Sequence, residues 1–170
     1  TVSILWTIRM PRAVMAFLVG ASLAASGAVM QAVLRNPLAS SYTLGVSSGA
    51  SLMAAIVLTT GLTLPGLGGY TLPLFGFLGG LGTVFLAMGL SMRFSKNLEN
   101  QTIILVGMVL SLFVNALLTL ITSMAGDRLK QLVYWQMGSF SGQSWANAGL
   151  VLPILLLSLL VLLRYSREMD

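Results

Sequence analysis

The polar side chains that could handle a solute gather in one stretch, LRNPLASSYTLGVSSGAS, which runs from Leu34 to Ser51. It carries an arginine, an Asn-Pro pair and several serines, and it lies between two strongly apolar segments. Polar, non-helical backbone is tolerated at membrane depth only where protein buries it or where it lines a water-filled space. The stretch therefore predicts a re-entrant or short, broken helix at the centre of a transporter or channel. A plain loop between two helices is the alternative.

Within this stretch each residue type has an expected role. The Asn-Pro pair ends one helix, because a proline disfavours the helical conformation of the residue before it. Ser40 or Ser41 can cap the next helix. Serine hydroxyls can bond neighbouring carbonyl groups, and glycine allows close contact. The residues that we expect to form the broken element or the solute pathway are Asn36, Pro37, Ser47, Ser48 and Gly49.

Residues for bond-making chemistry are scarce. Histidine and cysteine are absent, which excludes disulfides, thiol chemistry and histidine-based metal sites within these residues. Of the four acids, Glu99, Asp127, Glu168 and Asp170, none lies inside an apolar run, so a proton relay within the membrane has no candidate carboxylate. An ATPase would need a Walker A motif, which does not occur. The sequence therefore predicts no enzyme, no metal site and no cofactor.

The composition is that of an integral membrane protein. The chain is 56% hydrophobic and 8% charged, and its mean hydropathy is +0.93, whereas soluble domains carry roughly 25% charged residues. The net charge of +5 reflects nine basic and four acidic residues, and the basic residues stand singly or in pairs at the ends of apolar runs. Such residues anchor helices in lipid and set membrane topology, so we expect no nucleic-acid partner.

The apolar runs predict an all-α, polytopic helix bundle. A spanning helix needs roughly 20 apolar residues, and five runs qualify, over residues 11–34, 42–60, 71–92, 101–125 and 146–165. Pro11 fits the first turn of the first helix. The amphipathic segment from Gly126 to Trp145 is too polar to span and predicts a short helix at the surface. Small residues at four-residue spacing, such as Gly76 and Gly80, predict close helix packing.

Several ordered motifs resemble the FecCD-type permease family, the BtuC-like membrane subunits of ABC importers for ferric siderophores, haem and cobalamin. They are R-x-P-R from Arg9, G-A-x-L-A-x-S-G-A-x-x-Q from Gly20, R-N-P-L-A from Arg35, L-G-x-x-x-G-A from Leu44, G-x-x-L-S-x-x-x-x-A from Gly107 and W-x-M-G-S-F from Trp135. The resemblance covers essentially all 170 residues and implies a BtuC-like fold.

The resemblance also implies an architecture and partners. Family members have about ten spans and work as homodimers or heterodimers, so residues 1–170 resemble spans two to six of a single permease domain. The first span and the C-terminal half would then be missing. The implied partners are an extracytoplasmic substrate-binding protein, cytoplasmic ATPase subunits, a second permease subunit and membrane lipid. The ATPase docking surface would lie beyond Asp170. The implied location is the bacterial plasma (inner) membrane, in a multi-pass arrangement.

Four residues acquire site roles by the resemblance. Arg9 and Arg12 would lie outside the cell and dock against acidic side chains of the binding protein, since arginine pairs with carboxylates in a fork. The alternative is that they anchor a helix end among the lipid headgroups. Asn100 and Gln101 resemble the cytoplasmic gate, and helix capping by Asn100 is the alternative. Arg93, Lys96, Arg164 and Arg167 would lie inside, a small excess of basic charge on that side.

The expected function is therefore the permease subunit of a binding-protein-dependent ABC importer, for which ferric siderophore is the first substrate expectation. Haem and cobalamin are the alternatives within the family. An ion-coupled secondary transporter is the remote alternative, because it would need intramembrane acids or paired broken helices.

Overall fold

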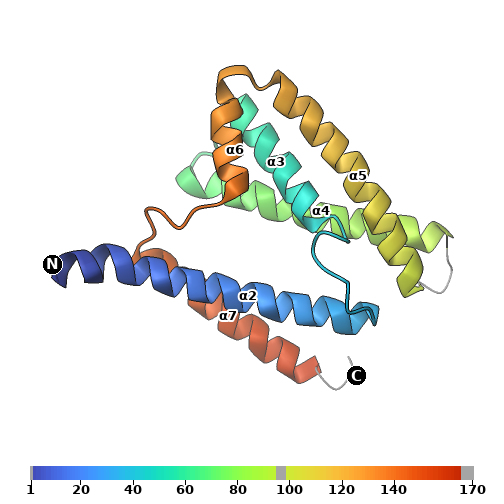
Figure 1. The fold of residues 1–170 in the computed structure, drawn as a ribbon, viewed down its shortest axis with the longest axis horizontal. Helices are drawn as coiled ribbons and strands as arrows, with labels where there is room; N and C mark the ends of the chain where they lie inside the picture. The colour runs from blue at the N-terminus through green and yellow to red at the C-terminus, as the bar shows by residue number, and fades with distance from the viewer. Residues whose placement is uncertain (1, 95–98, 166–170) are drawn as a thin grey trace. The chain divides into compact units, whose positions relative to one another are not determined.

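The computed structural model describes residues 2–94 and 99–165, and every regular element in this part is a helix (Figure 1). In chain order the elements are α1 (Val2–Ile4), the π-helical turn η1 (Leu5–Arg9), α2 (Met10–Leu34), α3 (Val46–Thr60), the 3-10 turn η2 (Gly68–Tyr70), α4 (Thr71–Phe94), α5 (Asn100–Met124), the 3-10 turn η3 (Gly126–Arg128), α6 (Leu129–Met137) and α7 (Trp145–Tyr165). The predicted all-α class is confirmed. The chain forms two compact units, one of residues 1–33 with 139–170 and one of residues 34–138.

Four helical segments of the described ranges are long and apolar enough to cross a membrane, namely Val2–Leu34, Gly68–Phe94, Asn100–Met124 and Trp145–Tyr165. The span expected over residues 42–60 is wrong at its start, because α3 begins only at Val46 and has 15 residues. At 1.5 Å per residue α3 is about 22 Å long, less than the roughly 30 Å of the hydrocarbon core. A short helix after a non-helical segment stands where a full span was predicted.

The first spanning helix begins earlier than Pro11, contrary to the sequence prediction. Helix precedes Pro11 from Val2 onward, and its turn just before the proline is π-helical, with the Met10 N–H donating to the Leu5 carbonyl. Proline lacks an N–H, and its ring clashes with the carbonyl four residues earlier in a regular α-helix. The wider π turn is the local irregularity that accompanies the proline, so the helix passes through Pro11.

The first unit consists of two neighbouring helices that run in the same direction. Trp6, in the π turn, and Trp145, at the start of α7, have ring centroids 5.4 Å apart, so the N-terminal ends of the two helical segments meet. Further along the two helices a buried core is formed by Met15, Leu18, Ala148 and Leu155. In Figure 1 α7 runs in the same general direction as α2 and diverges from it toward its C-terminal end.

The second unit is built around α3, which packs against α4, α5 and α6. Gly76 and Gly80 of α4 are buried, and a Cβ on Gly80 would lie 3.1 Å from Val46 of α3. The predicted packing through small residues is thus confirmed for this pair of helices. At the other end of α3 a second core forms from Ala55, Leu58, Ala125 and Leu132.

The short surface helix predicted between Gly126 and Trp145 is confirmed as α6. Its Leu132 is fully buried in the second unit, whereas Val133 and Tyr134 are exposed. Its core-facing side therefore centres on Leu132, and its other side is uncovered in the described chain.

Candidate functional site

The segment between α2 and α3 folds into consecutive turns that carry the Asn36 and Pro37 of the sequence prediction. Arg35 has a φ of 47°, which ends α2. The Asn36 side chain then accepts a hydrogen bond from the Leu38 N–H at 2.9 Å, and the Asn36 carbonyl accepts one from the Ala39 N–H at 3.0 Å. This asparagine turn follows the end of α2 at the point where proline prevents helix continuation. Asn36 and Pro37 therefore lie in the break, as expected.

The expectation that Ser40 or Ser41 caps the next helix is wrong. The N-cap is Gly45, with a φ of 80° that favours glycine, and no side chain caps this end. The hydroxyl of Thr43 instead accepts from the Ser40 N–H and donates to the Ser40 carbonyl, at 3.0 and 2.7 Å. Residues 40–45 close a compact turn on themselves, which delays the start of α3 to Val46.

The carbonyl of Gly45 is the centre of a hydroxyl cluster. It accepts hydrogen bonds from the Gly49 N–H at 2.9 Å, from the Ser48 hydroxyl at 2.9 Å and from the Thr83 hydroxyl of α4 at 3.0 Å. The Thr83 hydroxyl also lies 2.8 Å from the Gly80 carbonyl of its own helix, so its one proton is shared between the two carbonyls. Ser48 and Thr83 are both buried. A polar backbone group at the broken end of α3 is thus satisfied by two side chains, one of which comes from another helix.

A second hydroxyl holds the same turn from α5. The Ser111 hydroxyl lies 3.1 Å from the carbonyl of Tyr42 and 2.8 Å from that of Gly107, so its one proton is shared between them. A Cβ on Gly107 would lie 2.6 Å from the Thr43 carbonyl oxygen, which shows how closely the turn approaches α5. We call Thr83, Ser111 and the carbonyls of Tyr42 and Gly45 the hydroxyl clamp.

The predicted pathway residues of α3 have different surroundings. Gly49 is buried against α4, where an added Cβ would overlap Thr83 and the Gly79 carbonyl. Ser48 points its hydroxyl back to Gly45. Ser47 is half-buried, and no hydrogen-bond partner for its hydroxyl occurs among the residues that the structure describes. Of the two serines, Ser48 has a hydrogen-bond partner for its hydroxyl, and Ser47 has none among the described residues.

The two arginines expected to dock a binding protein lie at the start of the first unit. Arg9 is the last residue of the π turn, Arg12 follows in α2, and both are exposed. Beside them the Trp145 indole donates a hydrogen bond to the Trp6 carbonyl at 3.0 Å. This bond ties the beginning of α7 to the π turn that ends at Arg9.

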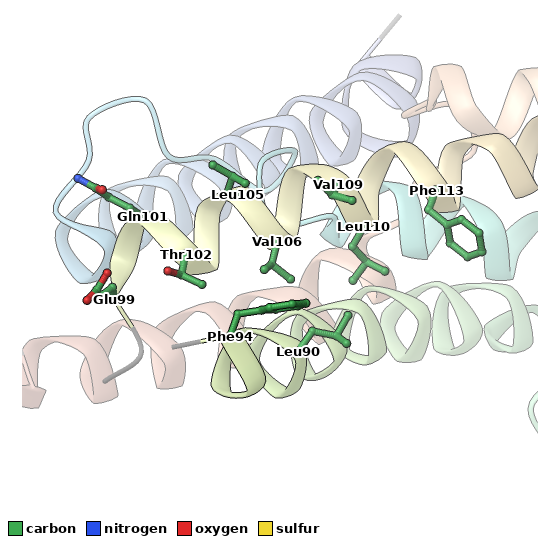
Figure 2. A pocket seen from close by; sticks show the side chains of 10 residues that line it. All are labelled: Leu90, Phe94, Glu99, Gln101, Thr102, Leu105, Val106, Val109, Leu110 and Phe113. Atoms are coloured by element: carbon green, nitrogen blue, oxygen red, sulfur yellow. The ribbon is translucent and has the colours of Figure 1, made fainter. Parts of the chain in front are cut away.

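The two expected gate residues begin α5. Glu99 is its N-cap, Asn100 its first residue, and Gln101 is exposed. Gln101 lies at one end of an apolar groove of about 880 Å³ between α4 and α5 (Figure 2). The groove is lined by Leu90, Phe94, Glu99, Gln101, Thr102, Leu105, Val106, Val109, Leu110 and Phe113. Lys96, which precedes α5 in the sequence, lies outside the described residues, as does Arg167.

The sequence analysis missed the roles of Thr83 and Ser111. Thr83 and Ser111 each follow a glycine by four residues, at Gly79 and Gly107. A glycine and a hydroxyl at this spacing lie on one helix face, and this pattern could have indicated a close, hydrogen-bonded contact with another element. Within the described ranges no group of three or more metal-ligating side chains occurs. The arrangement can hold helices together and offer polar groups to a solute.

A family model and curated relatives both match this chain over most of its length. The model of the FecCD transport family matches residues 1–170. Over 168 residues the chain is 41% identical to YvrB of Bacillus subtilis (strain 168), described as an uncharacterized ABC transporter permease protein, covering 99% of this chain and 48% of that protein. It is also 41% identical over 153 residues to the vitamin B12 import system permease protein BtuC of Yersinia enterocolitica, covering 88% and 44% of the two chains.

A solved structure shows the same fold. It is an inward-facing conformation of a metal-chelate type ABC transporter, with a TM-score of 0.83 and 31% identity, covering 98% of this chain and 52% of that one. The chain thus spans about half the length of the relatives it matches. Its apolar helices and these relatives identify a multi-pass protein of the bacterial plasma membrane. Because the family model matches all 170 residues, the chain belongs to the FecCD transport family.

Proposed function

We propose that the protein is the permease subunit of a binding-protein-dependent ABC importer and that it provides the solute pathway without chemistry of its own. The observation that carries this proposal is the match of the FecCD transport family to residues 1–170. The relatives named as permeases support it, since each is 41% identical to this chain. ATP hydrolysis then belongs to separate cytoplasmic subunits, and a second permease subunit completes the pathway.

The substrate class that we propose is a bulky metal chelate, with ferric siderophore as the first candidate. The likeness to a metal-chelate type transporter supports the class. Cobalamin, itself a metal chelate, is the second candidate, because the chain is 41% identical to a vitamin B12 permease. A pathway for such solutes suits scattered neutral polar groups, which offer weak contacts and no tight charged pocket.

Within this chain the proposed pathway residues are Ser47 and Gln101, with Asn100 beside the latter. Ser47 is the predicted hydroxyl that has no partner in the described chain, so it is available to a passing solute. Gln101 is exposed at the end of the α4–α5 groove (Figure 2). Neutral amides suit a gate, because they can close against one another without trapping unpaired charge.

The proposed outer docking residues are Arg9 and Arg12. Both are exposed and belong to the same helical end. Opposite acidic groups on a binding protein would pair with their guanidinium groups and steer the encounter. The orientation that follows has this helical end outside the cell.

The test is solute uptake by cells in which the full-length gene is deleted and then restored. Radiolabelled ferric siderophore and cobalamin are supplied separately. Loss and rescue of iron uptake supports the first candidate, and loss and rescue of cobalamin uptake alone moves the substrate to the second. Unchanged uptake of both, and of haem, in the deletion strain would overturn the chelate-importer proposal.

A further inference from the structure

The C-terminal end of α3 is capped by an arginine that lies 70 positions further along the chain. The Arg128 guanidinium donates a hydrogen bond to the Leu58 carbonyl at 2.7 Å. The neighbouring carbonyl of Val57 accepts from the Gly61 N–H at 2.9 Å. Carbonyls of a last helical turn have no partner within the helix, and a cation there also interacts favourably with the helix dipole.

Gly61 leaves the space that this contact needs. It has a φ of 72°, and a Cβ at this position would lie 3.0 Å from Nη1 and 3.4 Å from Nη2 of Arg128. The guanidinium therefore sits directly against the C-cap of α3. Because α3 is shorter than the hydrocarbon core, an unsatisfied carbonyl at its end would be costly, and Arg128 satisfies that of Leu58.

Arg128 immediately precedes α6, and the segment that contains both is bounded by two glycines with positive φ. Gly126 has a φ of 52° and Gly138 a φ of 70°, and at both positions an added Cβ would meet no atom within 4 Å. Between them Leu132 is fully buried against Ala55, Leu58 and Ala125. The segment 127–137 is thus a short helical segment flanked by a glycine at each end. It is held to the rest of the second unit by the buried Leu132 side chain and by the hydrogen bond from Arg128 to the Leu58 carbonyl.

We propose that Arg128 is a latch that holds this segment, the α6 flap, closed over the end of α3, and that breaking the Arg128–Leu58 bond lets the flap lift at Gly126 and Gly138. Lifting withdraws Leu132 and opens the space beside Ala55 to water (Figure 1 shows α6 beside α3). The latch stands on the geometry of the second unit. Only its placement on the outer side, beneath a binding protein, depends on the proposed function.

The test measures water access to the position that Leu132 covers. Ala55→Cys is introduced into the full-length protein in nanodiscs, with any cysteines outside residues 1–170 replaced, and its reaction rate with a water-soluble maleimide is measured. Arg128→Gln removes the latch. Its matched control is Lys130→Gln, which removes an exposed positive charge two residues away that lies over Tyr134. Arg128→Lys keeps the charge but loses the fork of donors.

We expect Arg128→Gln to speed labelling at least about tenfold, because a hydrogen bond to a charged group is lost. Lys130→Gln should leave the rate unchanged, and Arg128→Lys should give a smaller increase. Labelling of Arg128→Gln at the wild-type rate, or an equal rise in Lys130→Gln, would overturn the latch.

A second pair of variants approaches the latch from α3. Gly61→Ala pushes on the guanidinium, whereas Gly66→Ala carries comparable backbone strain, at a φ of 85°, with no atom within 4 Å of its Cβ. Faster labelling in Gly61→Ala than in Gly66→Ala supports the latch, and equal rates in both overturn it. Uptake assays report separately on the proposed function, since the labelling needs neither solute nor binding protein.

Discussion

The Thr83 hydroxyl of α4 lies 3.0 Å from the Gly45 carbonyl, although 38 positions separate the two residues. This bond and its counterpart from Ser111 fix the non-helical turn before α3 between two spanning helices. Polar backbone in the second unit is therefore anchored by neighbouring helices, as burial at membrane depth requires.

Thr83→Val should destabilise the full-length protein by about 1 kcal/mol, because it removes one buried donor while keeping the side-chain shape. The measurement is the thermal unfolding midpoint in nanodiscs. Thr119→Val is the control, since the exposed Thr119 bonds only the Asn115 carbonyl of its own helix. Equal shifts of the unfolding midpoint in the two variants would show that the Thr83–Gly45 hydrogen bond adds no stability beyond that of a bond within one helix.

Gly49→Ala should lower the yield of folded protein and its unfolding midpoint. The added methyl overlaps Thr83 and the Gly79 carbonyl, and backbone cannot yield cheaply, so about 1–3 kcal/mol of overpacking cost is expected. Gly89→Ala on α4 is the control, because its Cβ meets nothing within 4 Å. A Gly49→Ala protein as stable as the control would contradict the close approach of α3 and α4.

Trp145→Phe should cost more stability than Trp6→Phe. The Trp145 indole is the donor in the bond between these residues, whereas Trp6 contributes its backbone carbonyl, which phenylalanine retains. The expected difference is about 1 kcal/mol, read from unfolding midpoints of the two variants. Equal losses would mean that ring packing alone joins the ends of the helices.

Arg9→Glu should weaken docking of the binding protein strongly at low salt and less at high salt, because salt screens exposed charges. Affinity is measured by surface binding at several ionic strengths. Arg93→Glu, on the last turn of α4, is the control for a change of net charge. Docking by Arg9→Glu that matches wild type at every salt concentration would rule out the docking role.

The sequence predicted the helices better than the contacts that hold them. Apolar runs fix α4, α5 and α7 to within a few residues, because length and hydropathy alone decide a span. The start of α3 was misjudged because the apolar run continues through residues 42–45, whereas the Thr43 hydroxyl and the left-handed Gly45 close these residues into a turn. The helix before Pro11 was missed because a π turn has no clear sequence signature.

The candidate site could be predicted only in part. The break at Asn36 and Pro37 follows from local backbone preferences, and the structure has it there. The roles of Thr83 and Arg128 depend on residues 38 and 70 positions away, so no local pattern specifies them. The docking and gate roles of Arg9, Arg12, Asn100 and Gln101 are still predictions.

The parallel pairing of α2 with α7 has a consequence for biogenesis. The N-terminal ends of these helices meet at Trp6 and Trp145, yet the residues of the entire second unit are synthesised between them. During translation the helices of the second unit are complete once Gly138 is made, whereas the α7 residues that pack on α2 are synthesised afterwards. The contacts between α2 and α7 are therefore expected to form only after the second unit has been synthesised.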